Sequence, residues 1–333
     1  MDRMDFTHAV ARLRVMEKRL LDKNKVERLL DSNGAEEVLR ILQETVYGEG
    51  INNIESAYEY EKVLKEELVN LYDSLNKISP VKDVIDIMSM RYDYHNIKVL
   101  IKAKALGKDL SNILIPIGTI PLDTLKNSIS TGELKPLGKY VADAIKDIEL
   151  KFGESKDPQV IDVLLDKYMF NSMLSKAKEM NIDYITRYVL ESIDITNIKT
   201  MLRVKKQNKD GRFLEAVLIP NGTIKESLYL EGLNDSLENF IAKISRTEYS
   251  KVLSSILEEY SASGNISSLD ALYDNYIMNH AKDAKRVNFG PEPIIAYIIA
   301  KETEIKIIRI IMVGKINNVS TEIIRERLRD LYV

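Results

Sequence analysis

One phrase recurs three times along this chain of 333 residues, and its spacing constrains the fold more than any other feature. The copies read YDYHNIKVLIKAK (92–104), ITNIKTMLRVKKQ (195–207) and ETEIKIIRIIMVGK (302–315). All three contain the dipeptide Ile-Lys, and the three dipeptides lie 101 and then 107 residues apart. Solenoid repeats are only about 20–50 residues long. The spacing therefore predicts repeated units of domain size.

Two further phrases return at a similar step. IPIGTI (115–120) returns as IPNGTI (219–224), and LLDKYMFNSMLSKAK (164–178) returns loosely as LYDNYIMNHAKDAK (272–285). Each unit thus reads as a tyrosine-bearing helix, the Ile-Lys helix, a turn with proline and glycine, and another helix. We predict three helical units, at residues 1–110, 111–215 and 216–333.

The start of the chain resembles the tail of a unit. ETVY (44–47) is similar to RTEY (246–249), whereas the third unit stops soon after its Ile-Lys helix. We expect the N-terminal stretch to complete the third unit, so that the units close into a ring with approximate threefold symmetry and the two ends of the chain meet. Residues 151–159 and 260–268 are the candidate boundaries between units.

An all-α fold follows from the composition and from the apolar spacing. Proline and glycine are scarce, with 8 and 14 residues, which disfavours a turn-rich β fold. Near the C-terminus the apolar residues recur at helical spacing. They are Ile294, Ile298, Ile305, Ile308 and Met312, with Ile295, Ile299 and Ile311 beside them.

The limits of the last two helices can also be predicted. Pro291 and Pro293 mark the start of the long apolar helix, because a missing N–H costs little there, and Gly314 marks its end. A final helix is expected over 320–331, with Ser320 as its N-cap. Its expected surface ion pairs have i,i+3 spacing and are Glu322 with Arg325 and Glu326 with Arg329.

Composition and motifs exclude several functions. The chain has no cysteine, and a formal net charge of −3 does not fit a strongly basic nucleic-acid-binding surface. The apolar run 294–300 falls far short of the roughly 20 residues that a membrane span needs. No phosphate-binding glycine loop occurs, and the three histidines are scattered. We therefore predict no catalytic residue, no cofactor, no metal site and no nucleic-acid partner.

The repeated phrase carries basic residues at i,i+3 or i,i+4 spacing. They are Lys98, Lys102, Lys199, Arg203, Lys306 and Arg309. In a ring these side chains could line a central opening and bind an acidic or helical partner. Alternatively, they form a solvated stripe that balances neighbouring acids. Asn96 and Asn197 are expected to hydrogen-bond the backbone in the same local way twice.

The phrases together resemble one family. RYDYHNIKVLIKAK, FGPEPIIAYIIAKETEIKIIRIIMVGK, IRERLRDLYV and the N-terminal AVARLRVMEKRLL, followed by LLDSNGAEEVLRILQETVYG, are similar to the C subunit of bacterial and archaeal V/A-type ATPases. The eukaryotic relative is the d subunit of the V-ATPase. The resemblance extends from about residue 7 to the end of the chain, and its C-terminal block is the most specific part.

This resemblance implies a funnel of three similar helical domains in a rotary ATPase. Such a protein is a non-catalytic part of the central stalk. It sits peripherally on the cytoplasmic face of the membrane ring of proteolipid (c/K) subunits and receives the foot of the rotor shaft, built from the D and F subunits. It would transmit torque for ion transport, of sodium or of protons, or for ATP synthesis. The alternative is an all-helical scaffold or adaptor outside rotary ATPases.

Overall fold

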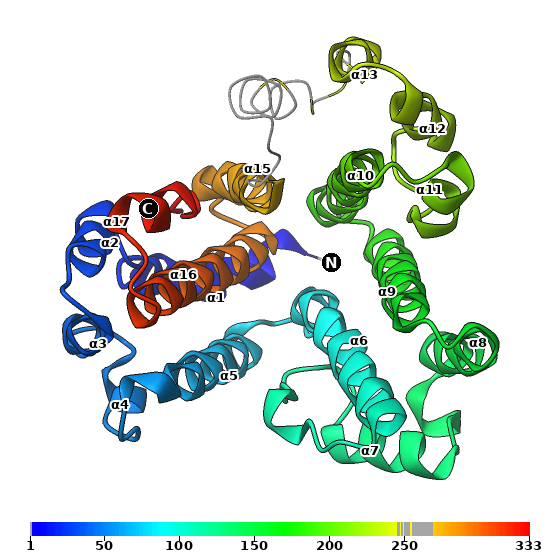
Figure 1. Ribbon diagram of the computed structural model, residues 1–333. Coiled ribbons are helices and arrows are strands. Elements are labelled where there is room, and N and C mark those ends of the chain that lie inside the picture. Colours follow the sequence, from blue (N-terminus) through cyan, green and yellow to red (C-terminus); the bar gives the residue numbers. More distant parts are fainter. Residues whose placement is uncertain (1, 245–246, 248, 250–253, 255–268) are drawn as a thin grey trace. The chain divides into compact units, whose positions relative to one another are not determined.

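The computed structural model describes residues 2–244, 247, 249, 254 and 269–333, and this part of the chain is built from helices and connecting turns without a strand (Figure 1). The prediction of an all-α fold is thus confirmed. The chain divides into two compact units, one of residues 1–85 and 267–333 and the other of residues 86–266. The expected boundary at 260–268 falls outside the described residues.

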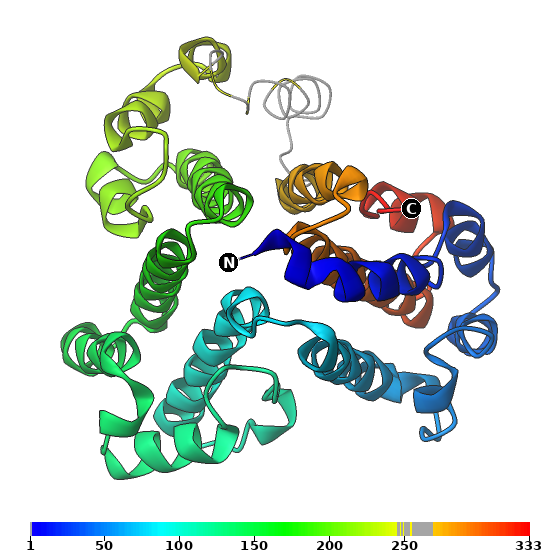
Figure 2. The same ribbon diagram turned by 180° about the vertical axis from the view of Figure 1, so that it is seen from behind.

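Unit 1 combines the two ends of the sequence. Its α-helices are α1 (Thr7–Glu17), α2 (Lys23–Leu30), α3 (Ala35–Leu42), α4 (Gly48–Ile51), α5 (Tyr60–Ile78), α15 (Leu269–Asp283), α16 (Glu292–Ile316) and α17 (Thr321–Glu326). Helix α16 lies at the centre and packs against α1, α3, α5, α15 and α17 (Figures 1 and 2). All eight apolar residues predicted for its buried faces are less than a twentieth exposed. Residues 292–301 of α16 are all buried, which explains why apolar residues surround this part of the helix on every side.

Two predictions about the limits of helices near the C-terminus are wrong. Helix α16 does not end at Gly314 but continues to Ile316. The glycine is needed for packing, since a Cβ atom there would lie 2.4 Å from Cδ1 of Ile324 on α17. Helix α17 starts after the expected N-cap, Ser320, but ends at Glu326.

The early end of α17 changes the expected ion pairs. Arg329 lies beyond the helix, and its Nε is 2.6 Å from Oδ2 of Asp274 instead of pairing with Glu326. Arg325 forms its ion pair with Glu27 on α2 rather than with Glu322. Both arginines therefore connect the C-terminal segment to other helices of unit 1, while Glu322, Arg325 and Glu326 are exposed as expected.

Unit 2 contains the first two Ile-Lys helices. Its α-helices are α6 (Asp83–Leu106, which begins just before the unit boundary), α7 (Leu122–Thr131), α8 (Lys139–Ser155), α9 (Pro158–Met180), α10 (Asp183–Lys206), α11 (Gly211–Val217), α12 (Glu226–Asn234) and α13 (Leu237–Ile244). One apolar core joins α6, α7, α8 and α9. Helix α10 packs on α9, α11 and α12.

The candidate boundary at 151–159 is a tight junction between α8 and α9. Lys156 ends α8 in the left-handed conformation, at φ 56°. The carboxylate of Asp157 then caps α9 by accepting a hydrogen bond from the amide of Gln159, and Pro158 occupies the first turn. Both helices contribute to one core, so this junction lies inside a compact unit.

Candidate functional site

The three Ile-Lys helices are α6, α10 and α16, and each carries a buried polar centre just before its Ile-Lys dipeptide. On α6, Asp93 is 2% exposed and its carboxylate accepts hydrogen bonds from the amide and hydroxyl of Thr119 and from the amide of Ile120, at 2.5–3.0 Å. One turn on, Asn96 bonds both backbone groups of Ile115, at 2.7 and 2.8 Å. These two side chains hold the turn 115–120 against the helix.

Helix α10 repeats this centre in the second copy. Asp194 is fully buried and accepts from Thr223 and from the amide of Ile224, while Asn197 bonds both backbone groups of Ile219 at 2.8 Å. The prediction that Asn96 and Asn197 bond the backbone in the same way is confirmed. Asp194 also accepts from the hydroxyl groups of two tyrosines, Tyr229 and Tyr249.

Glycine is required in both turns. A Cβ atom at Gly118 would lie 2.1 Å from Oδ1 of Asp93, and one at Gly222 would lie 2.2 Å from Oδ1 of Asp194. Only a residue without a side chain lets the carboxylate approach the turn backbone this closely. The shared Gly-Thr-Ile sequence thus has a direct physical cause.

The third centre, on α16, occupies the same positions relative to Ile-Lys but is made of charged residues. Lys301 stands where the other copies have aspartate, and Glu304 stands where they have asparagine. Both are at most 3% exposed, and Nζ of Lys301 lies 2.6 Å from Oε1 of Glu304. Lys301 also lies 3.1 Å from Glu67 on α5 and 4.3 Å from the ring centroid of Tyr47. The positive charge is therefore surrounded by two carboxylates and an aromatic face.

The N-terminal part of the chain completes this third centre. Glu304 accepts a hydrogen bond from the amide of Leu21, as the two asparagines accept from Ile115 and Ile219. It also accepts from the hydroxyl of Tyr47, at 2.7 Å. Tyr47 is thus the counterpart of Tyr249 in the second copy. This observation gives a structural basis to the likeness between ETVY and RTEY, and it brings the two ends of the sequence together within unit 1.

Burial and charge shift the pKa values around the third centre. Desolvation raises the pKa of Glu67, and Lys301 partly opposes that shift. Desolvation, and then the charge of Glu304, raise the pKa of Tyr47 well above its ordinary value, so that its hydroxyl stays protonated and donates. The arrangement links α16 to α5 and to the N-terminal segment.

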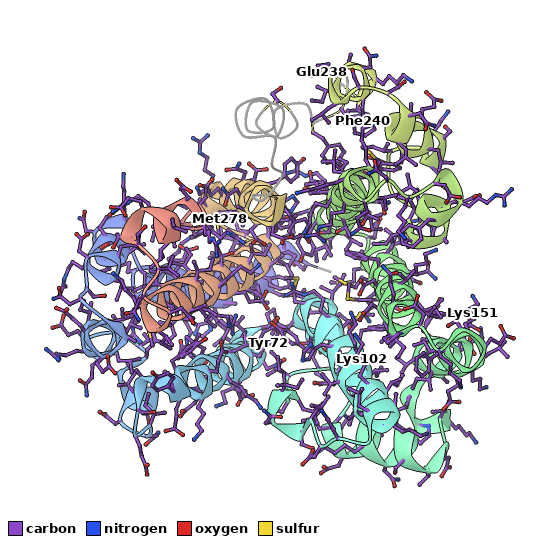
Figure 3. All side chains as sticks on the ribbon, viewed as in Figure 1. Tyr72, Lys102, Lys151, Glu238, Phe240 and Met278 are labelled. Atoms are coloured by element: carbon purple, nitrogen blue, oxygen red, sulfur yellow. The ribbon has the colours of Figure 1, made fainter. Side chains whose placement is uncertain are left out.

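Of the six basic residues predicted as a partner-binding set, four have identified acidic partners. In unit 2, Lys98 lies 3.3 Å from Asp166, and Lys102 (Figure 3) binds Asp162 at 2.7 Å, which links α6 to α9. In unit 1, Lys306 lies 2.7 Å from Asp274 on α15, and Arg309 binds both carboxylate oxygens of Glu61 on α5 at 2.6 and 3.0 Å. These contacts match the alternative in which the basic stripe balances neighbouring acids.

The remaining two basic residues lie on α10, where Lys199 is half-buried and Arg203 is exposed. Lys98 and Lys102 both approach Asp162, whereas Lys306 and Arg309 bind acids on different helices. Whether any of them contacts a partner remains a prediction.

Known proteins resemble this chain along almost its whole length. A family model described as ATP synthase (C/AC39) subunit matches residues 9–327. The chain belongs to that family. The C subunit of the V-type sodium ATPase of Enterococcus hirae is 29% identical over 320 residues, which are 96% of this chain and 97% of that protein.

Two archaeal proteins show a similar likeness to this member of the C/AC39 family. The C subunit of the A-type ATP synthase of Methanocaldococcus jannaschii is 29% identical, covering 99% of this chain and 88% of that protein. The C subunit of the A-type ATP synthase of Methanosphaera stadtmanae is 28% identical, and the match covers 95% of this chain and 85% of that protein. The expected resemblance to the C subunit of V/A-type ATPases is therefore confirmed.

Neither a membrane-spanning helix nor a metal site is found in the described part of the chain. No described helix has both the length and the apolar character to cross a membrane. No described group of histidine and acidic residues has the arrangement of a metal site.

Sequence reasoning missed the residues that define the polar centres of this C/AC39 family member. The missed residues are Asp93, Asp194, Lys301, Glu304, Tyr47 and Tyr249. One signal was present, because an aspartate stands four residues before Ile-Lys in the first two copies and each following turn contains Gly-Thr-Ile. The polar centre of the third helix could not be recognised in the same way, because lysine and glutamate stand there in place of aspartate and asparagine.

Proposed function

We propose that this chain is the non-catalytic central-stalk subunit of a rotary V/A-type ATPase. It acts as a socket and spacer that couples the shaft of D and F subunits to the membrane ring of proteolipid (c/K) subunits. The observation that carries the proposal is the family match over residues 9–327, together with relatives named as the C subunit over nearly their whole length. The Enterococcus relative is named a sodium ATPase, which favours sodium as the transported ion.

The polar centres support a mechanical role. The first two fix a turn onto α6 or α10 through several hydrogen bonds to a buried aspartate, and the third ties the N-terminal segment to α16. Dense helical packing also resists deformation. A part that transmits torque needs this stiffness. We further propose that the three repeats predicted from the sequence, 1–110, 111–215 and 216–333, form a funnel with approximate threefold symmetry around the shaft. This funnel would lie on the cytoplasmic face of the membrane.

A reconstitution experiment tests the proposal. The purified chain is immobilised and offered the D–F pair and the detergent-solubilised proteolipid ring of the same organism, separately and together. We expect each partner to be retained and a ternary complex to form when both are present. Retention of the D–F pair should weaken as salt rises, because charged contacts at an interface rim are screened. Failure to retain either partner would contradict the coupling role and favour a helical scaffold unrelated to rotary ATPases.

The six basic residues of the Ile-Lys helices remain a proposal for the surface that meets the shaft. The triple variant Lys98→Glu, Lys199→Glu, Lys306→Glu should weaken retention of the D–F pair. Because Lys98 and Lys306 pair with aspartates, the reversal also places carboxylates side by side and lowers the stability of the fold.

A neutral triple variant with methionine at positions 98, 199 and 306 separates these two effects. It removes the positive charges without creating repulsion, so it should fold better and still lose affinity for the shaft. Unchanged retention of the shaft by both variants would reject this assignment.

A further inference from the structure

A second group of basic residues lies on unit 1, on the exposed side of α1 and on the short 3-10 helix η5 (Ala284–Arg286). The segments 8–19 and 282–286 contain two acids, Glu17 and Asp283. Their lysines and arginines are Arg12, Arg14, Lys18, Arg19, Lys282, Lys285 and Arg286. We call these seven residues the α1–η5 basic surface. It is strongly positive although the whole chain carries a formal charge of −3.

Direct contacts join the two segments into one surface. Arg14 of α1 donates hydrogen bonds to the carbonyl oxygens of Ala284 and Val287, at 3.2 and 2.7 Å. Lys285 lies 4.7 Å from the ring centroid of Tyr332. Desolvation and the neighbouring charges of Lys282 and Arg14 lower the pKa of Lys285, as expected for cations that lie close together. Figure 2 shows α1 in front of α16, and Arg12, Val15, Lys18 and Arg19 are exposed.

Most cations of this surface form no ion pair among the described residues, whereas four of those on the Ile-Lys helices do. Among the described residues, Arg14 pairs with Glu17, whereas Arg12, Lys18, Arg19 and Arg286 are exposed and form no ion pair. Lys98, Lys102, Lys306 and Arg309 are each neutralised by an acid on a neighbouring helix. An incoming acidic group would gain a new ion pair at the α1–η5 basic surface without first breaking an existing one.

Two exposed apolar residues of α1 lie among the basic residues of this surface. Val15 is 56% exposed, and Ala11 lies exposed one turn before it on the same side. Along the helix, Arg14 flanks this pair on one side and Arg12 on the other, and the exposed Lys18 and Arg19 follow directly after the last helical residue. An apolar strip between two rows of charge is the half of a two-helix contact that fits an amphipathic helix with acidic flanks.

We infer that the α1–η5 basic surface is a docking site for an acidic amphipathic helix of the rotor shaft. This inference rests on the proposed function and adds a partner chemistry and a place on unit 1. A second copy of this chain does not fit, because it would bring basic surface against basic surface. The charge complementarity lies at the rim, so it should speed association and make binding sensitive to salt.

The test compares two triple charge reversals that change the net charge equally. The surface variant is Arg12→Glu, Lys18→Glu, Arg286→Glu. The control variant reverses three exposed lysines of unit 2 that form no ion pair among the described residues, Lys135→Glu, Lys146→Glu and Lys178→Glu. The dissociation constant for the D–F pair is measured by calorimetry at low and high salt. Helical content and the midpoint of thermal unfolding are recorded for each variant.

We expect the surface variant to bind the D–F pair at least about tenfold more weakly at low salt and to lose most of its salt dependence. The control variant should bind within about threefold of the original chain. Equal weakening by both variants, or no weakening by either, would overturn the inference while leaving the proposed function intact. Failure of the original chain to bind the D–F pair would instead contradict the proposed function, and the inference with it.

A second arm distinguishes a protein partner from a lipid surface. The original chain and the surface variant are sedimented with vesicles that contain about a third phosphatidylglycerol in phosphatidylcholine. Little co-sedimentation of either is expected. If the original chain binds the vesicles, and the surface variant loses that binding but keeps its affinity for the D–F pair, the surface would belong to the membrane and the inference would be overturned.

Discussion

The polar centres of the second and third Ile-Lys helices occupy the same place but are built from different chemistry. In unit 2, the Asp194–Asn197 centre closes over a turn only 22–30 residues further along the chain. In unit 1, the Lys301–Glu304 centre closes over Leu21 and Tyr47, which are 283 and 257 residues away. The centre in unit 1 uses a buried ion pair, whereas the centre in unit 2 uses the carboxylate of an aspartate and the amide of an asparagine.

This difference shows how one geometry can serve two tasks. Asp194 is surrounded by five donors from its own copy, so its charge is satisfied by local hydrogen bonds. Glu304 receives fewer backbone donors, and Lys301 supplies the missing positive charge. A buried ion pair adds selectivity to a contact between distant parts of a chain, because each partner is costly to bury without the other.

The largest effect is expected from removing the lysine of the third centre. Lys301→Met leaves Glu67 and Glu304 buried without a cation and should lower the free energy of unfolding by about 3–5 kcal/mol. Chemical denaturation followed by circular dichroism measures the change. Lys62→Met on α5 is the control, since that lysine is 70% exposed and its loss should cost less than about 1 kcal/mol. Equal costs would show that the charges of the third centre do not stabilise unit 1.

A glycine substitution probes the corresponding contact in unit 2. Gly222→Ala places a methyl group against the carboxylate of Asp194 and should cost about 1–3 kcal/mol. Gly153→Ala, inside α8 with no atom near the added carbon, should instead stabilise the protein by about 0.5–1 kcal/mol. Denaturation midpoints of the two variants compare them directly. A neutral result for Gly222→Ala would mean that the close approach of Asp194 to the turn is dispensable.

Two tyrosine substitutions compare the centres on equal terms. Tyr47→Phe removes one of the few donors to Glu304 and should cost about 1.5–3 kcal/mol, whereas Tyr249→Phe leaves four donors on Asp194 and should cost about 0.5–1.5 kcal/mol. Both changes retain the ring, so the difference reports the hydroxyl group. If Tyr249→Phe lowered the free energy of unfolding more than Tyr47→Phe, then Glu304 would not depend on each of its hydrogen-bond donors more than Asp194 does, and this comparison would be wrong.

A smaller effect should appear as a dependence on pH. The pKa of Glu67 is raised by burial, so the folded protein holds this proton at a higher pH than the unfolded chain does. The stability that this proton contributes is present below the ordinary glutamate pKa and is lost as pH rises through the raised value. Glu67→Gln should remove this part of the pH dependence, which begins at the ordinary glutamate pKa of about 4.3 and extends above it. Parallel stability curves for the two proteins would contradict the shift.

The helices, the repeat and the roles of Asn96 and Asn197 could be predicted from the sequence because they follow local spacing and identical residues. The function of Gly314 could not, because the close contact with Ile324 depends on how α17 returns onto α16. The ion pairs of Lys98 and Lys306 depend on neighbouring helices whose register no short motif reveals. The third polar centre was hidden for the same reason, since half of it comes from the other end of the chain.

The central claim is that the N-terminal segment completes the third copy of the repeated helix motif. Hydrogen exchange at three equivalent amides, those of Leu21, Ile115 and Ile219, tests it most directly. All three should be strongly protected, and Glu304→Ala should abolish protection at Leu21 while leaving Ile115 and Ile219 protected. An amide of Leu21 that exchanges as fast as an exposed turn in the original chain would contradict the claim.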